Sequence, residues 1–208
     1  MVQKEPDETR RPRGRPRSFD PDQVLDKARA VFWNLGYAAT SLDDLAAATG
    51  LNRPSLYAAF GDKHALYMAA LERSRAEATA ALGAALNAEA PLRQLLKVIF
   101  DRTVDIYRAG TQGQRGCFLI GTAVTQAIDD PAAREMLATF IGQTDALFTA
   151  RFQRDAAQLA VGVTPQMAGP MASATFHTLA VRSRTGVGEA ELKAIGAAAV
   201  AMLCGPAD

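Results

Sequence analysis

Apolar residues recur at every third or fourth position along most of the chain, which is the spacing of one face of an α-helix. Clusters of β-branched residues are few, and alanine is frequent from residue 81 onward. Glycine and proline breaks divide the second half into helices expected at 91–109, 117–129, 131–161, 165–184 and 188–204. The pattern therefore predicts an all-α fold.

Two short helices separated by a glycine turn are expected between residues 40 and 63. The first has its N-cap at Thr40 or Ser41 and ends at Gly50, where a left-handed backbone closes the helix. The second has its N-cap at Asn52 and ends before Gly61. Two short helices joined by a tight turn that contains glycine are the signature of a helix-turn-helix.

The two faces of the second short helix differ in character. Leu56 and Phe60 are four positions apart, which predicts that both point inward. Pro54 lies in the first turn, where a missing N–H leaves no helical bond unmade. The other face is the one that a DNA-reading helix would present, and it carries Arg53, Ser55, Tyr57 and Ala58.

Longer helices are expected on both sides of this pair. Asp20, Pro21 and Gln23 start the preceding helix as its N-cap, first-turn proline and capping-box partner. That helix ends at Gly36, and a helix of roughly 20 residues begins at Asp62. The apolar stripe of the preceding helix consists of Val24, Ala28, Val31, Phe32 and Leu35.

Positive charge is concentrated at the N-terminus, although the formal net charge of the chain is only +1. Residues 1–17 contain Arg13, Arg15 and Arg17 within a short extended segment. Such an arm either lies in a narrow A·T-rich minor groove or remains a solvated tail. Its position directly before a helix-turn-helix favours DNA, because arms of such domains reach into the minor groove.

Several classes of protein are disfavoured by what the sequence lacks. Its two cysteines, Cys117 and Cys204, are far apart, so neither a disulfide framework nor a zinc site is expected, and a reducing cytoplasm fits. The sequence shows no secretory signal and no apolar run long enough to span a membrane. It has no metal-ligand cluster, nucleophile elbow or glycine-rich phosphate loop. We therefore expect a cytoplasmic protein that is not an enzyme and that holds no cofactor.

Residues 17–67 resemble the TetR family of bacterial transcriptional regulators. The resemblance is carried by Ala30-Val31-Phe32, Gly36-Tyr37, residues 40–46, residues 48–57 and Phe60-Gly61-Asp62-Lys63. It implies an Ω-shaped homodimer of protomers with a three-helix DNA-binding domain and a six-helix ligand-binding and dimerisation domain. The expected division is a flexible arm at 1–17, the helix-turn-helix domain at 18–65 and the ligand-binding and dimerisation domain at 66–208.

The resemblance also implies how double-stranded DNA is held. Residues 52–58 are expected in the major groove, where Arg53, Ser55 and Tyr57 read bases or contact phosphate. Lys63 places a cation at a helix start, where the helix dipole favours anions. A phosphate partner would explain a cation there; the alternative is an ordinary surface lysine. The complete set expected at DNA is Arg13, Arg15, Arg17, Tyr37, Thr40, Ser41, Asn52, Arg53, Pro54, Ser55, Tyr57 and Lys63.

A helical domain that binds a small-molecule effector needs an apolar cavity with a few polar groups. Cys117 follows a glycine at an expected helix start, where a thiolate that could react with an electrophile would be stabilised; the alternative is a small buried hydrophobe. The candidates, each with core packing as its alternative, are Phe100, Tyr107, Cys117, Phe118, Gln126, Phe140, Thr144, Phe148 and His177.

A finer resemblance concerns the effector. Residues 14–17, 53–57 and 116–122 are similar to the subgroup of acrylate-responsive regulators, which suggests a small unsaturated acid or its thioester as the effector.

The small residues of 165–184 and 188–204 favour a homodimer that packs these last two helices about a two-fold axis. The expected function is a ligand-responsive repressor of a palindromic operator; the alternatives are an effector-independent DNA-binding protein, an activator and an enzyme.

Overall fold

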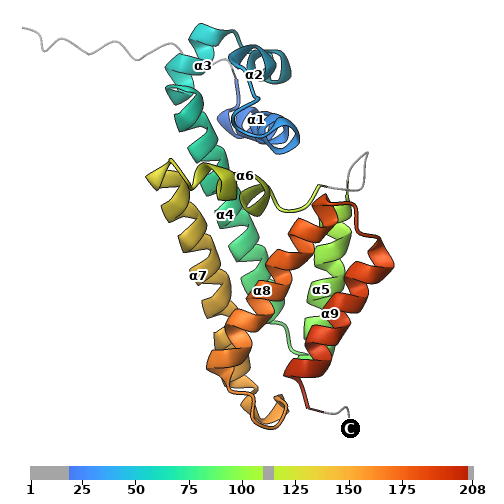
Figure 1. Cartoon of the computed structure of the whole chain (residues 1–208). Coiled ribbons are helices and arrows are strands. Elements are labelled where there is room, and N and C mark those ends of the chain that lie inside the picture. Colours follow the sequence, from blue (N-terminus) through green and yellow to red (C-terminus); the bar gives the residue numbers. More distant parts are fainter. Residues whose placement is uncertain (1–18, 110–114, 206–208) are drawn as a thin grey trace, which may run out of the picture.

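The computed structural model describes residues 19–109 and 115–205, and these ranges are almost entirely helical (Figure 1). The all-α prediction is confirmed. Within the same ranges, no helix is both long and apolar enough to cross a bilayer. The helices are α1 (Pro21–Leu35), α2 (Leu42–Thr49), α3 (Arg53–Phe60), α4 (Lys63–Leu86), α5 (Leu92–Arg108), α6 (Phe118–Gln126), α7 (Pro131–Arg154), α8 (Pro165–Arg184) and α9 (Glu189–Leu203).

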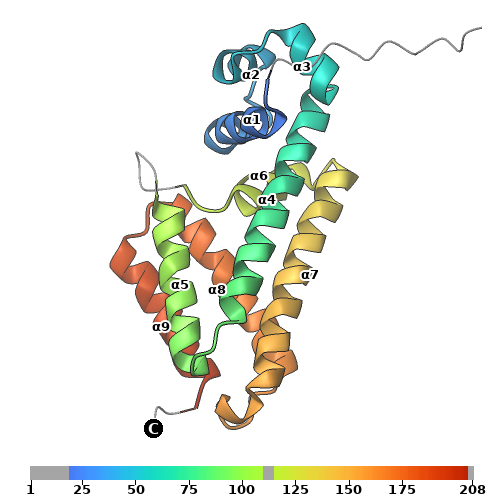
Figure 2. The same ribbon diagram turned by 180° about the vertical axis from the view of Figure 1, so that it is seen from behind.

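The molecule is elongated, and α4 runs along much of its length (Figures 1 and 2). Helices α1, α2 and α3 gather around the N-terminal part of α4, at one end of the molecule. Helices α5, α7, α8 and α9 pack together at the other end, and α6 lies between the two groups, in contact with α1, α4, α7 and α8. Because α4 belongs to both groups, it is the structural link between them. The domain boundaries at residues 17 and 65 stay a prediction.

Polar caps define the starts of the first four helices. The side chain of Asp20 accepts a bond from the N–H of Asp22, and Asp62 accepts one from Ala65 at 2.7 Å. Of the two candidate caps for α2, the structure has Ser41, which forms a reciprocal capping box with Asp44. Asn52 caps α3, as predicted. The α2–α3 turn is closed by Gly50 at φ 75°.

Two sequence expectations about helix extent are wrong. The helix predicted at 131–161 ends at Arg154 and is followed by a short 3₁₀ turn, Ala156–Gln158. Its end is held by the buried guanidinium of Arg151, which donates to the carbonyls of Leu86, Ala88 and Ala90 and pairs with Asp155. Helix α6 ends at Gln126 rather than residue 129, because Arg134 takes the carbonyls of residues 127 and 128. Helix α4 has 24 residues.

Two details of α1 also differ from the sequence analysis. Leu35 is 50% exposed and lies outside the buried stripe, because it is the last residue of the helix before Gly36 turns the chain away. Val24, Ala28 and Phe32 are buried as expected. The cap at Asp20 is a single side-chain bond to Asp22, without a reciprocal bond from Gln23.

Candidate DNA-binding site and the helices behind it

Helix α3 presents one face to the core and the other to solvent. Leu56 is buried and Phe60 is partly buried, which confirms the predicted inward face. Arg53, Pro54 and Tyr57 are exposed, and Tyr57 keeps 48% of its surface accessible despite its large ring. An exposed aromatic ring beside an exposed arginine is the kind of surface that can contact bases and phosphates.

The polar residues near the start of α3 have different roles in the fold. The Oδ1 atom of Asn52 accepts the N–H of Ser55 at 2.9 Å, so this oxygen is used for capping. Ser55 itself is half-buried. The hydroxyl of Ser41 donates to the Asp44 carboxylate at 2.6 Å within the α2 capping box. These residues lie at the surface expected to face DNA, but the side-chain oxygens of Asn52 and Ser41 already have partners.

Arg53 is paired with a carboxylate of the preceding helix. Its Nε donates to Oδ1 of Asp43 at 2.8 Å, and its Nη2 donates to Oδ2 at 2.5 Å. The hydrogen bond and the charge of Arg53 lower the pKa of Asp43. Sequence reasoning overlooked Asp43, since an acid in the first turn of a helix is already explained by the helix dipole.

Lys63 and Thr40 differ most from their expected roles. The Nζ of Lys63 donates to the carbonyls of Tyr37 at 3.0 Å and Thr40 at 2.9 Å, and it lies 4.4 Å from the centre of the Tyr37 ring. The hydroxyl of Thr40 donates to the carbonyl of Gly36, and Thr40 is 1% exposed. Phosphate contacts by these two side chains are therefore not supported, because carbonyls of the α1–α2 connection take the Lys63 cation and the Thr40 hydroxyl is buried.

Tyr37 forms part of the same surface. It is half-buried, its ring lies 4.8 Å from that of Tyr67, and burial, with help from Asp62 and Asp130, raises its pKa. Its phenol is therefore neutral at pH 7 and remains a candidate hydrogen-bond donor. The arm residues Arg13, Arg15 and Arg17 lie outside the described residues, so their role stays a prediction.

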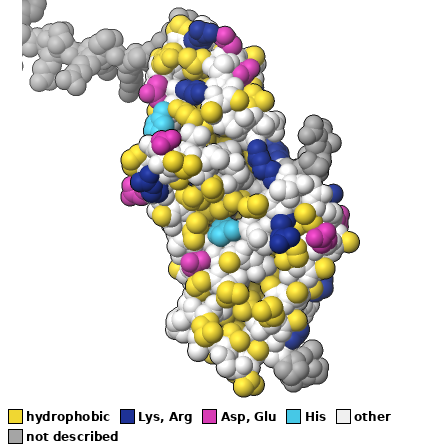
Figure 3. All heavy atoms as spheres, in the orientation of Figure 1, with side chains coloured by type: hydrophobic (Ala, Val, Ile, Leu, Met, Phe, Trp, Pro, Cys, Tyr) yellow, Lys and Arg dark blue, Asp and Glu magenta, His cyan; other side chains and the backbone are white. Residues whose placement is uncertain are grey.

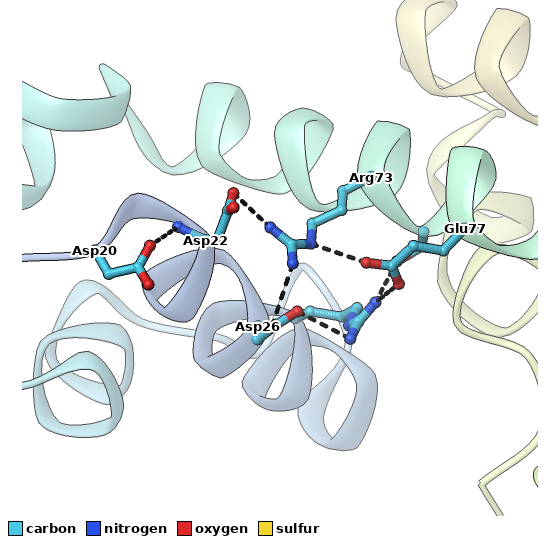
Figure 4. Close-up of polar contacts among 7 residues, drawn as sticks. Asp20, Asp22, Asp26, Arg73 and Glu77 are labelled. Carbon is cyan, nitrogen blue, oxygen red and sulfur yellow. Dashed lines mark hydrogen bonds and ion pairs between the residues drawn. The ribbon is translucent and has the colours of Figure 1, made fainter.

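An ion-pair network fastens α1 to α4 (Figure 4). Arg73 on α4 pairs with Asp22 at 2.6 Å, Asp26 at 3.5 Å and Glu77 at 2.9 Å. Arg29 on α1 pairs with Asp26 at 3.0 Å and Glu77 at 2.5 Å. Burial alone would raise the pKa of Glu77, but the two arginines outweigh it and lower that pKa. This network couples the orientation of α1 to that of α4.

Trp33 connects α1 to the segment before α6. Its indole N–H donates to the carbonyl of Arg115 at 2.9 Å, and the Arg115 guanidinium lies over its ring at 4.2 Å. Its own carbonyl accepts from Arg184 of α8 at 3.2 Å, and its ring lies 5.8 Å from that of Phe118. A shift of α6 or α8 would therefore act directly on α1.

The candidate effector residues do not form one cluster. Phe100, Tyr107, Phe140, Phe148 and His177 are joined through the ring of Phe176, which lies 5.6 to 6.4 Å from His177, Tyr107 and Phe148. Phe118 packs instead against Trp33 and Tyr67. Gln126 is the last residue of α6 and is half-buried. Sequence reasoning missed Phe176, although its place next to His177 on an apolar helix was a usable signal.

A small polar group lies inside this aromatic cluster. The hydroxyl of Thr144 is 3.0 Å from that of Ser173 and 3.1 Å from Nε2 of His177. Burial lowers the pKa of His177 to about 4, so the imidazole is neutral at pH 7. Its Nδ1 is buried and has no hydrogen-bond partner among the described residues. Ser173, four positions before His177, was also missed by sequence reasoning.

Of the two alternatives for Cys117, the stabilised thiolate is contradicted by its surroundings. Cys117 does precede the first residue of α6, and the N–H groups of Ile120 and Leu119 help to lower its pKa. Burial is the larger effect and raises that pKa above its ordinary value. The side chain is 7% exposed and contacts Tyr107, so the second possibility, a small buried hydrophobe, describes it better.

Known proteins share both the sequence of the N-terminal helices and the whole fold. Residues 24–70 match the family described as bacterial regulatory proteins, tetR family. A structure of a cysteine mutant of the TetR family transcriptional regulator CifR, complexed with 26-base-pair operator DNA, is similar over 89% of this chain and 98% of that chain, with a TM-score of 0.78 and 29% identity. The N-terminal helices of this chain therefore match the TetR family, and its whole fold is similar to that of a TetR-family regulator.

Two curated relatives within or near this family illustrate the range of activities. The HTH-type transcriptional repressor ComR of Escherichia coli (strain K12) is 56% identical over 61 residues, 29% of each chain. The HTH-type transcriptional activator FasR of Mycolicibacterium smegmatis is 32% identical over 103 residues, 50% of this chain and 47% of that one. The chain matches only 29% to 60% of the length of its curated relatives. All of these relatives are named as HTH-type transcriptional regulators, repressors or activators, in agreement with the expectation that the chain is not an enzyme.

Proposed function

We propose that this chain is a ligand-responsive transcriptional repressor that binds a palindromic operator as a homodimer and is released by a small-molecule effector. The exposed face of α3 carries the proposal. That face bears Arg53, Pro54 and Tyr57 on a helix that packs against α2 and buries Leu56 on its other side. The operator complex of CifR supports the same mode of binding, because the two folds are similar along almost their whole length.

The proposed homodimer uses the outer faces of α8 and α9. Hydrophobic side chains gather along α8 on the face seen in Figure 3. Met167, Met171 and Val181 of α8 are 51% to 58% exposed, and Met202 of α9 is 67% exposed. Exposed apolar side chains gathered on one face are typical of an interaction surface. Two-fold pairing would present two α3 helices to half-sites about one DNA turn, roughly 34–36 Å, apart.

The effector is proposed to bind within the aromatic cluster of α5, α7 and α8. Thr144, Ser173 and His177 offer hydroxyl groups and a neutral imidazole among the rings of Phe140 and Phe176. Such a setting suits a small molecule with one carbonyl or carboxylate group on an apolar body, and an unsaturated acid or its thioester is of this class. The effector releases DNA only if it binds the non-operator conformer more tightly.

Selection from a random double-stranded DNA library would test DNA recognition. We expect the purified protein to enrich a palindrome with half-sites spaced by about one helical turn. Tyr57→Ala should weaken binding to the enriched sequence, because it removes the exposed ring of α3. Ile106→Ala on α5 is the matched control, because Ile106 is also exposed but lies in the other group of helices. Failure to enrich any sequence would overturn the proposal.

A second experiment separates the alternatives. Thermal-shift and operator-release measurements with unsaturated acids and their thioesters should identify compounds that stabilise the protein and release DNA. Tight operator binding that no such compound changes would favour an effector-independent DNA-binding protein. Activation rather than repression depends on where the operator lies relative to the promoter, so a reporter with the enriched palindrome would distinguish the two. Turnover of a bound compound would point to an enzyme.

A further inference from the structure

The guanidinium of Arg53 is fixed by two hydrogen bonds from one of its edges. Nε and Nη2 donate to the two carboxylate oxygens of Asp43, at 2.8 Å and 2.5 Å. Arg53 is the first residue of α3, and Asp43 is the second residue of α2. The pair therefore holds the start of the recognition helix to the start of the helix before it. A bidentate pair of this kind fixes orientation as well as distance.

The outer edge of the same guanidinium is left available. An arginine has five N–H donors in one plane, and Asp43 takes only two of them. Among the described residues, Nη1 and the second N–H of Nη2 have no protein acceptor, and the side chain is 55% exposed. Two parallel N–H groups on that edge match the O6 and N7 acceptors that guanine presents in the major groove.

The charge of the pair favours a base over a phosphate. The Asp43 carboxylate is 72% exposed, and its bonds to Arg53 lower its pKa, so it is ionised at pH 7. The Arg53–Asp43 pair is consequently close to neutral and would attract a phosphate much less than a free arginine does. A guanine edge carries no net charge and offers two acceptors, so it remains a good partner for the outer edge.

Helix capping does not account for Asp43. The capping box of α2 is completed by Ser41 and Asp44, which exchange both bonds. Asp43 instead turns toward α3 and reaches a residue ten positions along the chain. Exposed ion pairs contribute little to stability, so the fold gains little from this geometry.

We propose that Asp43 is a positioning residue that presents the outer edge of Arg53 to a guanine in each operator half-site. The proposal rests on the proposed function, because it requires α3 to bind DNA. It predicts that one position in each half-site is selected as a G·C pair. The preference for this pair should depend on Asp43, although Asp43 acts only through Arg53. It also assigns Arg53 to base reading rather than to phosphate contact.

The test compares base preference in matched variants. Wild-type protein and Asp43→Ala are each used to select from the random DNA library, and competition binding then replaces every base pair of the enriched half-site in turn. We expect wild type to prefer guanine by at least about five-fold at one position. Asp43→Ala should reduce this preference to less than about two-fold at that position and leave the other positions unchanged.

Two further variants make the result specific. Glu72→Ala removes a carboxylate that holds Arg75 in the same way, through Nε at 2.8 Å and Nη2 at 2.5 Å, but on α4, so its base preferences should equal those of wild type. Arg53→Lys keeps the charge and loses the planar fork, so it should lose the preference at the same position as Asp43→Ala. The double variant should show no additional loss, because the two residues act as one unit.

Three outcomes would overturn the proposal, and they differ in what else they affect. If Asp43→Ala binds all sequences more tightly with an unchanged guanine preference, Asp43 only repels DNA. If Arg53→Lys and Asp43→Ala alter different positions, the two residues do not read one base together. Either result leaves the proposed repressor function intact. If wild-type protein selects no sequence, the proposed function fails and this inference fails with it.

Discussion

His177 is a titratable side chain whose surroundings strongly favour one protonation state. It lies among Phe140 and Phe176, with the hydroxyls of Thr144 and Ser173 at Nε2. Burial lowers its pKa to about 4, and the charge of Asp145 offsets only part of this effect. The folded protein therefore keeps this imidazole neutral well below pH 7.

The first prediction concerns the pH dependence of stability. Between pH 6.5 and about 4, the unfolded chain binds a proton at His177 and the folded chain does not, so stability falls as the pH falls through this window. The loss should amount to roughly 2–3 kcal/mol. Urea unfolding at several pH values should show that His177→Gln removes this component. Equal losses for wild type and variant would contradict it.

The second prediction concerns the two cysteines. Cys117 and Cys204 are both buried, and burial raises the pKa of both thiols. Because the thiolate is the reactive form, neither should react with iodoacetamide in the folded protein near pH 7. Intact-mass measurement should show no adduct in buffer and two adducts in concentrated urea. Rapid modification of Cys117 in the folded protein would restore the hypothesis of an electrophilic effector.

At the scale of whole elements, α7 and α8 approach each other closely at Gly169. Gly169 of α8 lies against Thr149 of α7, so that a Cβ atom at residue 169 would stand 1.9 Å from the Thr149 Oγ1 and 3.0 Å from its backbone nitrogen. The absence of a side chain is what permits this approach. By contrast, a Cβ atom at Gly142 of α7 would have no other atom within 4 Å.

These two glycines provide the third prediction. Gly169→Ala should destabilise the protein by about 1–3 kcal/mol, because α7 or α8 must move to accommodate the methyl group. Gly142→Ala should stabilise it by about 0.5–1 kcal/mol, because alanine is the better helix former and the site is open. Urea unfolding measures both free energies. If Gly169→Ala also stabilises the protein, helix propensity outweighs the contact with Thr149 at residue 169.

At the scale of the whole molecule, polar contacts tie α1 to α4, to the segment before α6 and to α8, and tie the start of α4 to α7. The network of Arg29 and Arg73 fastens α1 to α4 (Figure 4). Trp33 contacts the segment before α6 and also α8. His64 of α4 pairs with Asp130, the cap of α7, at 2.7 Å. Movement of α6, α7 or α8 would therefore act on α1 and on the start of α4, the helix that directly follows α3.

The fourth prediction tests the proposed homodimer. Met171 is 53% exposed on α8, and a charge there would be buried without a partner if two copies pair through this face. Met171→Glu should give a monomer by sedimentation velocity and bind the palindrome far more weakly. Val161→Glu is the control, because Val161 is fully exposed in the turn before α8 and outside the proposed interface. A dimer that survives Met171→Glu would exclude this face.

The amino-acid sequence determined the local structure, because caps, glycine turns and apolar spacing depend on residues a few positions apart. Asn52, Gly50 and the inward face of Leu56 and Phe60 were all predictable for this reason. Residues 24–70, which match the TetR family model, owe their pattern to the same local rules.

Only the tertiary structure decided which polar side chains have partners from distant parts of the chain. Lys63 reaches carbonyls 23 and 26 positions away, Trp33 reaches residue 115, and Thr144 meets His177 across two helices. No spacing rule connects such distant positions. Burial, which decides between the two alternatives for Cys117, depends on every surrounding helix. The Asp43–Arg53 pair lies between these cases, since both residues belong to the predicted helix-turn-helix but their contact depends on how α2 crosses α3.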